Sequence, residues 1–165
     1  MNFKRLIKHL ATPPWFLRRA FTPAGLAAIE AAIADSEARH LGQIRFAIED
    51  TLDWPALWRG KSARASAIEV FSSLRVWDTE QNNGVLIYLL LADRDVEIVA
   101  DRGIHRLAGE AAWEEICRSM EGDLRAGDYE RGVVRGIEAI SAVLIAHYPR
   151  REAGANELPD APIVL

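Results

Sequence analysis

The chain has 165 residues, half of them apolar and about a quarter charged, which is the composition of one globular domain with a buried core. A formal net charge of only −4 excludes the strongly basic surface of a general nucleic-acid binder, so no nucleic-acid partner is expected. The single cysteine, Cys117, excludes an internal disulfide and a cysteine-rich metal cage.

Residues 1–21 are predicted to form an arm in front of the domain. Residues 1–29 carry five Lys or Arg side chains and no acid, so the rest of the chain is acidic. An amphipathic helix is expected over residues 2–10, and the motif WFLRR follows at residues 15–19. Two alternatives are open for residues 3–19: a peripheral contact with an anionic membrane, or a clip that packs on the acidic body.

The chain shows no secretory signal and no apolar stretch of the length that spans a bilayer. A cytoplasmic location is therefore expected, with the inner membrane as the surface that a basic arm would touch.

The domain itself is expected over residues 22–148. Thr22 and Ser62 each have the sequence context of a helix N-cap. Between these two helices, residues 43–50 alternate apolar and polar side chains, which predicts a half-buried strand. The segment after it holds Trp54 and Trp58, four residues apart, and is predicted to be a loop or short helix that serves as a lid or a partner contact.

A β-hairpin is predicted next. Residues 85–92 form an unbroken apolar run, typical of a strand buried on both faces, and residues 96–100 form a second strand. Between them, Asp93 and Asp95 are interpreted as turn residues only.

Two amphipathic helices follow the hairpin. The second should begin at Asp128, and its Gly132 and Gly136 are expected to pack closely against the sheet. The tail, residues 149–165, is polar with an apolar end that is expected to dock on the body or on a partner. The fold class is therefore α/β: a small mixed sheet with an antiparallel hairpin, sandwiched by helices in three layers.

Oxygen-bearing side chains flank the hairpin. Because the start of one antiparallel strand lies beside the end of the next, Asn82 and Asn83 should meet Asp101 and Arg102. A candidate site for Ca²⁺ or Mg²⁺ follows, since hard cations prefer carboxylate and amide oxygens; its expected ligands are Asp78, Asn82, Asn83 and Asp101. Arg102 and the backbone at Gly103 are the candidate anion-binding groups. The alternative is ordinary turn chemistry, which selects the same residue types.

A nucleotide cofactor is not expected. Gly60-Lys61-Ser62 resembles the end of a phosphate-binding loop, but Pro55 stands where that motif needs a glycine.

Two blocks of sequence carry a resemblance to a known family. The run NNGVLIYLLLADRDVEIVADRGI and the later run AGDYERGVVRGIEAI resemble the TPM domain family, over roughly residues 24–147. Asn82 stands where many members have Asp in an Asp-Asn-Gly block, and Asp101-Arg102-Gly103 stands where many have Gly-Tyr-Gly. Asp128 and Tyr129 match the Gly-Asp-Tyr block of the family.

The resemblance implies a compact α/β sandwich. It also implies Ca²⁺ or Mg²⁺ binding as found for some members, acid phosphatase activity as proposed for some, and a role in membrane-protein maintenance or assembly as for many. We therefore expect a TPM-domain module that binds a protein partner, with a weak Ca²⁺ or Mg²⁺ site. The alternative is a divalent-metal-dependent phosphatase, in which Asp78, Asn83 and Asp101 hold the cation and Arg102 the phosphate.

Overall fold

The fold was analysed in a computed structural model that describes residues 3–13, 15–150 and 156–165. Predictions that fall on residue 2, on Pro14 or on residues 151–155 lie outside these ranges. The elements, in chain order, are α1 (Phe3–Ala11), α2 (Trp15–Ala20), α3 (Pro23–Glu37), β1 (Gln43–Glu49), α4 (Trp54–Trp58), α5 (Ala63–Ser73), β2 (Gly84–Leu90), β3 (Asp95–Ala100), α6 (Arg102–Ala108), α7 (Glu110–Ala126), α8 (Tyr129–His147) and β4 (Ile163–Val164).

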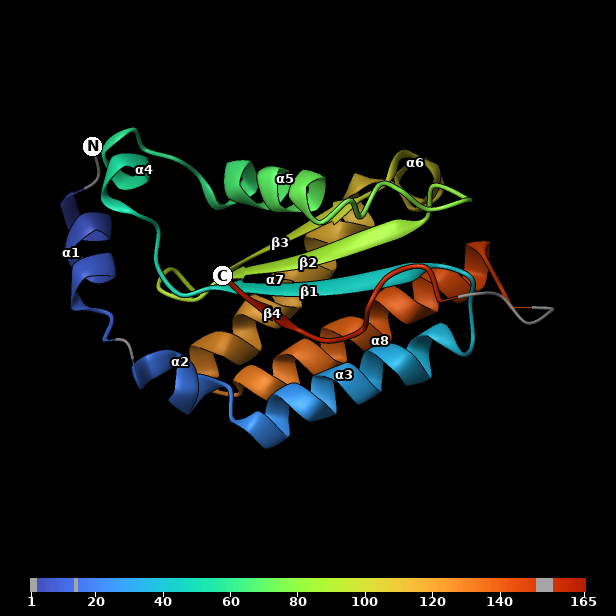
Figure 1. The fold of residues 1–165 in the computed structure, drawn as a ribbon, viewed down its shortest axis with the longest axis horizontal. Helices are drawn as coiled ribbons and strands as arrows, with labels where there is room; N and C mark the ends of the chain where they lie inside the picture. Colours follow the sequence, from blue (N-terminus) through green and yellow to red (C-terminus); the bar gives the residue numbers. More distant parts are fainter. Residues whose placement is uncertain (1–2, 14, 151–155) are drawn as a thin grey trace.

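A four-stranded mixed sheet with the order β3-β2-β1-β4 forms the middle layer. β1 is parallel to β2 and to β4, and β2 is antiparallel to β3. Helix α5 covers one face of the sheet, and α3, α7 and α8 cover the other (Figure 1). The predicted three-layer α/β architecture with an antiparallel hairpin is confirmed.

Apolar side chains alternate between two cores, one on each face of the sheet. In β2, Val85, Ile87 and Leu89 pack toward α3, α7 and α8. The intervening Leu86 and Leu90 pack on the other face, toward α5. β2 is therefore buried on both faces, as its apolar run predicted.

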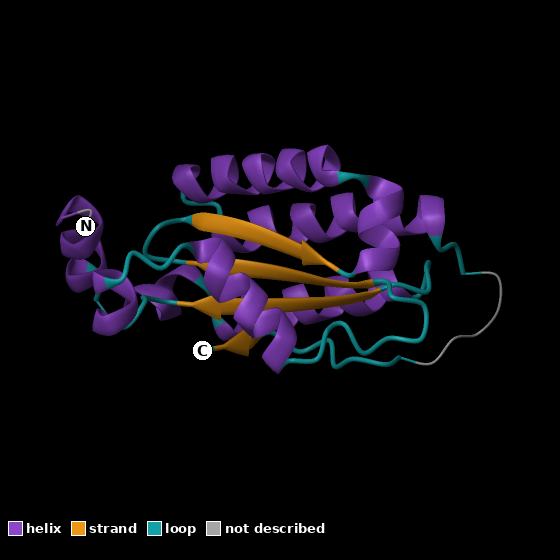
Figure 2. Ribbon diagram, turned by 90° about the horizontal axis from the view of Figure 1, so that it is seen from above, coloured by secondary structure: helices purple, strands orange, loops and turns teal. Residues whose placement is uncertain are grey.

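The prediction of a half-buried β1 is wrong. Every residue from Gln43 to Ile48 is buried, including Arg45, which is 6% exposed. Helices cover both faces of the sheet, and the tail covers the outer edge of β1, so the polar side chains of this strand are enclosed as well (Figure 2).

The predicted helix starts at Thr22 and Ser62 are confirmed. The hydroxyl of Thr22 accepts a hydrogen bond from the Gly25 N–H at 3.0 Å, and the hydroxyl of Ser62 accepts one from the Ala65 N–H at 3.1 Å. Both bonds satisfy backbone donors that the first turn of a helix leaves free.

The two glycines of α8 pack against a helix, which corrects the predicted contact with the sheet. A Cβ at Gly132 would lie 2.8 Å from the Cβ of Asp123, and one at Gly136 would lie 2.3 Å from the sulfur of Met120. Both neighbours belong to α7. The small residues therefore allow α7 and α8 to approach each other on the same face of the sheet.

The arm folds back on the body through Asp93. The Arg5 Nε donates to the carboxylate of Asp93 at 2.7 Å, and the Lys8 Nζ lies 3.5 Å from it. The ring of His9 accepts the Leu52 N–H through Nδ1, so its Nε2–H is the donor to Asp93 at 3.1 Å. Asp93 therefore anchors α1, and the prediction that it is only a turn residue is wrong.

The tail is ordered where the structure describes it. The side-chain oxygen of Gln43 accepts the N–H groups of Glu157 and Leu158 at 2.8 and 2.9 Å. Further on, Ile163 pairs with Ala47 as the short strand β4. The apolar end of the tail thus docks on the body as a strand, a form that the sequence analysis did not predict.

Candidate functional site

The start of β2 and the end of β3 lie side by side, as the hairpin predicted. The Asp101 N–H donates to the carbonyl of Gly84 at 2.8 Å, and the Ile104 N–H donates to the carbonyl of Asn82 at 3.2 Å. We call residues 82–83 and 101–103 the polar corner. The register of one strand pair therefore brings together residues that lie about 20 positions apart in the sequence.

Asn83 is fully buried at this corner. Its side-chain nitrogen donates to the carbonyl of Leu41 at 3.0 Å, and its own N–H donates to the hydroxyl of Thr79 at 3.1 Å. The side-chain oxygen Oδ1 is buried and has no hydrogen-bond partner among the described residues. A buried acceptor without a donor is costly, so it is a natural position for a ligand.

Asp101 also has a buried side-chain oxygen that lacks a hydrogen-bond partner among the described residues. It is 6% exposed and caps α6, with its Oδ1 accepting the Arg102 N–H at 2.6 Å. Its second oxygen, Oδ2, is buried and has no partner within the part of the chain that the structure describes. A carboxylate oxygen and an amide oxygen are thus left open at one corner of the sheet.

Gly103 allows the two chain segments of the corner to approach. A Cβ at this position would lie 2.4 Å from the carbonyl oxygen of Asn82 and 3.0 Å from that of Gln81. Asn82 itself has a φ of 52°, a left-handed conformation that Asn tolerates better than most residues. Its side chain is exposed.

Tyr148 also lies at the corner, although the sequence analysis did not include it in the candidate site. Its hydroxyl lies 3.5 Å from the carbonyl of Gln81, and a Cβ on Gly103 would come within 3.0 Å of it. Burial, and then the negative charge of Asp101, raises the pKa of Tyr148. Its position one residue after α8 gave no sequence signal for this contact.

The backbone N–H groups on either side of Gly103 are already bonded within the protein, and the anion-binding role of the Gly103 backbone stays a prediction. The Arg102 N–H is bonded to Asp101, and the Ile104 N–H is bonded to Asn82. Helix α6 has only seven residues, so its dipole offers little additional attraction. The guanidinium of Arg102 is on an exposed side chain, and its role in anion binding stays a prediction.

Asp78 does not join the buried oxygens. Its side chain is 52% exposed and forms an ion pair with Arg75, three residues earlier, at 3.0 Å. The two groups of the corner that combine burial with an open oxygen are therefore Asn83 and Asp101. No cluster of three or more His, Cys, Asp or Glu suited to a metal occurs among the described residues.

Trp54 and Trp58 do not form a lid over the polar corner. Helix α4 lies at one end of the molecule and α6 at the other (Figure 1). The two indole rings contact each other, with centroids 5.9 Å apart, and are 51% and 59% exposed. Their predicted role in a partner contact stays a prediction.

Comparison with known proteins supports the assignment of the family. A profile of the TPM domain matches residues 18–143. No curated protein matches the sequence. Within the described residues, no helix has the length and apolar character needed to cross a membrane.

Three solved structures have a similar fold. The BA42 protein of the psychrophilic bacterium Bizionia argentinensis aligns with a TM-score of 0.78 at 28% identity, over 88% of this chain and 95% of its own. The N-terminal domain of a P. gingivalis protein aligns with a TM-score of 0.63 at 16% identity, over 81% and 83%. The N-terminal domain of the cg2496 protein of Corynebacterium glutamicum aligns with a TM-score of 0.56 at 12% identity, over 82% of this chain and 78% of its own. The profile match spans most of the chain and shows that the chain belongs to the TPM domain family.

Proposed function

We propose that this TPM-domain protein is a non-catalytic module that binds Ca²⁺ or Mg²⁺ weakly at its polar corner and works through a protein partner. One observation carries the cation part: the buried oxygens Asn83 Oδ1 and Asp101 Oδ2 have no hydrogen-bond partner among the described residues. Carboxylate and amide oxygens are the ligands that hard cations prefer.

The composition of the corner supports weak binding. Asp101 is its one carboxylate, because Asp78 is exposed and paired with Arg75, and Asn82 stands where many family members have Asp. The affinity of an oxygen-ligand site for Ca²⁺ rises with the number of charged ligands. Water would have to complete the coordination shell.

Thermal melts with and without Ca²⁺ or Mg²⁺ test the cation proposal. A ligand that binds only the folded state, at ten times its Kd, adds about 1.4 kcal/mol to the free energy of unfolding. For a domain of this size we expect a rise in Tm of about 3–6 °C. Asp101→Asn, which keeps a good N-cap residue for α6, should abolish the rise.

Asp78→Asn is the matched control. It removes the same charge from an exposed position, so the Tm rise should persist, and NMR shifts on titration should centre on Asn83 and Asp101. Wild-type melts that coincide with and without cation would overturn the proposal. An equal loss of the cation-induced Tm rise in Asp101→Asn and Asp78→Asn would show that the proposed ligands are wrong.

The phosphatase alternative has less support. The N–H groups on either side of the predicted anion-binding backbone at Gly103 are bonded to protein acceptors. Positioned acid–base groups normally accompany phosphoester hydrolysis. Mg²⁺-dependent hydrolysis of p-nitrophenyl phosphate that disappears in Asp101→Asn would replace the non-catalytic proposal with this one.

A peripheral contact with an anionic membrane is a second candidate, favoured by the arm. Ile7, Leu10 and Trp15 are exposed by 51%, 69% and 58%, and Arg18 and Arg19 are exposed beside them. Exposed apolar side chains next to basic ones suit the boundary of an anionic bilayer. The internal pairing of Arg5 and Lys8 with Asp93 limits the charge that the arm can offer.

A further inference from the structure

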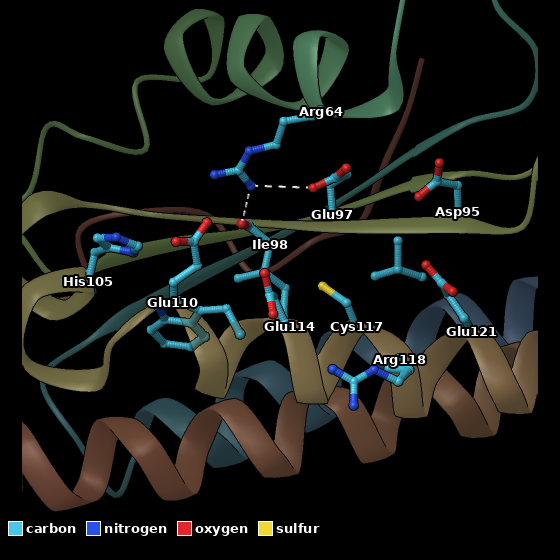
Figure 3. Close-up of a pocket in the computed structure, with 12 residues that line it drawn as sticks. Arg64, Asp95, Glu97, Ile98, His105, Glu110, Glu114, Cys117, Arg118 and Glu121 are labelled. Carbon is cyan, nitrogen blue, oxygen red and sulfur yellow. Dashed lines mark hydrogen bonds and ion pairs between the residues drawn. The ribbon is translucent and has the colours of Figure 1, made fainter.

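A groove with a volume of about 510 Å³ runs along β3, on the side of the sheet away from β4. Figure 3 shows Arg64 reaching toward it from α5, a row of polar side chains rising from α7, and His105 entering from α6. We call this space the β3 groove. It lies outside the polar corner and has no part in the cation proposal.

The side of the β3 backbone that faces away from β2 lies along this groove, beneath side chains that cover it. β3 is the last strand of the sheet and, among the described residues, pairs with β2 alone. Because Asp101 donates to Gly84 across the pair, the alternation of an antiparallel ladder turns the N–H and C=O groups of Val96, Ile98 and Ala100 toward the groove. Such an edge is a template for a further strand.

A cation partly caps that edge. The guanidinium of Arg64 donates to the carbonyl of Ile98 at 2.6 Å and lies 3.4 Å from the carboxylate of Glu97. Its side chain is 47% exposed, so it can swing away into solvent. The contact shows that the Ile98 carbonyl faces away from β2. The Ile98 N–H is bonded to the Cys117 thiol, so an added strand would displace both the Arg64 and the Cys117 side chains.

Trp113 supplies an independent sign that the groove accepts a ligand. It lines the groove and is 4% exposed, yet its indole Nε1 is a buried donor with no acceptor among the described residues. A buried indole N–H normally finds a hydrogen-bond partner. A carbonyl group of an added peptide chain would provide one.

The charge of the groove indicates what kind of peptide it fits. Five carboxylates line it against two arginines; the acids are Asp95, Glu97, Glu110, Glu114 and Glu121. Burial, and then the negative charges of Glu121 and Asp93, raises the pKa of Asp95. Cys117 adds no thiolate, since burial raises its pKa to about 12. Positive charge is therefore what this lining lacks.

We propose that the β3 groove binds an extended, basic segment of a protein partner, which adds to the sheet as a strand beside β3. Backbone hydrogen bonds to Val96, Ile98 and Ala100 give the affinity, and lysine or arginine side chains facing the carboxylates give the preference. This inference rests on the partner-binding half of the proposed function and names the surface and the chemistry of the partner.

A second copy of this chain is a poorer occupant. Pairing β3 with β3 of another copy would bring two acidic linings together, and like charges across an interface oppose association. The same surface therefore favours a basic partner and disfavours dimerisation.

A fluorescein-labelled peptide of about seven alternating lysine and valine residues tests the proposal by fluorescence anisotropy. We expect saturable binding that weakens with salt. The same peptide with alternate backbone nitrogens methylated keeps its charge but loses its donors, and should bind at least about tenfold more weakly. A glutamate–valine peptide should not bind.

Charge reversal on two neighbouring positions of α7 provides matched variants. Glu114 lines the β3 groove, whereas Glu115 lines a separate pocket against α8, and both are exposed. Glu114→Arg should weaken binding about three- to tenfold, and Glu115→Arg should leave it unchanged. Arg64→Ala should strengthen binding, because it frees the Ile98 carbonyl and removes a repelling cation.

NMR reports where the peptide lies. The Trp113 indole N–H resonance should move on binding, while those of Trp54 and Trp58 stay in place. The proposal is overturned if the lysine peptide does not bind, if methylation has no effect, or if Glu115→Arg weakens binding as much as Glu114→Arg. Sedimentation showing a dimer that the peptide cannot dissociate would assign the groove to a second copy. Either failure leaves the Ca²⁺-dependent melts untouched, so the two proposals fail separately.

Discussion

Gly103 shows how a single residue shapes the polar corner. Its backbone lies so close to residues 81 and 82 that no methyl group fits between them. The approach is needed because Asn82 must accept the Ile104 N–H while Asp101 bonds to its neighbour Arg102. The geometry of the two open oxygens thus depends on the absence of a side chain nearby.

Gly103→Ala should destabilise the protein by about 1–3 kcal/mol, because the new Cβ would lie 2.4 Å from a backbone carbonyl that cannot rotate away. Urea unfolding measures the change in free energy. In Gly122→Ala on α7 a Cβ would meet nothing within 4 Å, so this control should be stabilised by about 0.5–1 kcal/mol. A neutral Gly103→Ala would show that the corner is less tightly packed than the structure indicates.

At the residue scale, the sequence predicted that the segments of Asn83 and Asp101 meet, but not which of their oxygens lack a hydrogen-bond partner. Strand pairing alone brought Asn83 to Asp101, since register is a local property of a hairpin. The contact of Tyr148 with the corner depends on a segment that is distant in sequence. The ion pair of Asp78 with Arg75 is local, but it competes with the predicted ligand role of Asp78. Turn chemistry explains why Asn and Asp are present, but it leaves one oxygen of each side chain without a partner.

Among the elements, β1 and the tail differ most from the sequence-based expectation. β1 was predicted to expose one face, yet the tail lies along its edge and Gln43 holds that segment through two backbone N–H groups. Glu37, at the end of α3, accepts the Ile44 N–H at 2.7 Å and is 5% exposed. Burial, and to a lesser degree Asp160 of the tail, raises the pKa of Glu37 from 4.5 to about 8.

The raised pKa of Glu37 makes the free energy of unfolding fall as the pH rises from 4.5 to about 8. Between pH 4.5 and 8 the folded protein keeps a proton on Glu37 that the unfolded chain releases, which lowers the free energy of unfolding by up to about 1.4 kcal/mol per pH unit. Glu37→Gln should remove this slope, and urea unfolding at about pH 6.5 and 8 measures it.

The measurement is made above pH 6.5 because the titration of His40 changes stability in the opposite direction at lower pH. Burial lowers the pKa of His40 from 6.5 to about 4, so it costs stability only as the pH falls below 6.5. Glu30→Gln, an exposed change on the same helix, is the control and should keep the wild-type slope. Parallel curves for wild type and Glu37→Gln between pH 6.5 and 8 would contradict the raised pKa.

For the elements, periodicity and capping residues predicted most of the fold. The apolar run of β2, the caps at Thr22 and Ser62 and the stripes of α7 and α8 act within a few residues, so they are legible in the sequence. β4 was missed because a strand of two residues has no period to read. The packing of Gly132 and Gly136 was assigned to the wrong partner because a stripe of small residues does not say which element it meets.

On the scale of the whole molecule, the arm and the polar corner lie at opposite ends of the hairpin. Asp93 at the hairpin tip receives Arg5, Lys8 and His9, while the other end of the hairpin carries the polar corner. Burial alone would raise the pKa of Asp93, but the hydrogen bonds and charges of Arg5 and His9 outweigh it and lower the pKa. Charge holds α1 to the hairpin tip, and Leu6, Phe16 and Leu17 pack against the two cores. The apolar side chains of the arm that remain exposed are those of Ile7, Leu10 and Trp15.

Flotation with phosphatidylserine-containing vesicles tests the membrane candidate. We expect salt-sensitive binding that Trp15→Ala weakens about threefold or more, since an exposed indole is lost from the boundary. Asp93→Asn should increase flotation, because it releases the basic side chains of α1. Glu69→Gln, which removes an exposed ion pair with Lys61, is the control and should change nothing. No flotation of either wild type or Asp93→Asn would end this candidate.

The sequence by itself determined the order of the elements, the hairpin and its register, the helix caps and the family resemblance, because each depends on residues that are neighbours along the chain. Only the tertiary structure decided that Asp93 anchors the arm, that Asn83 and Asp101 each keep an open oxygen, and that five acids gather along the free edge of β3. Burial, charge and hydrogen bonding join side chains that lie far apart in the sequence, and they take effect when the layers pack together.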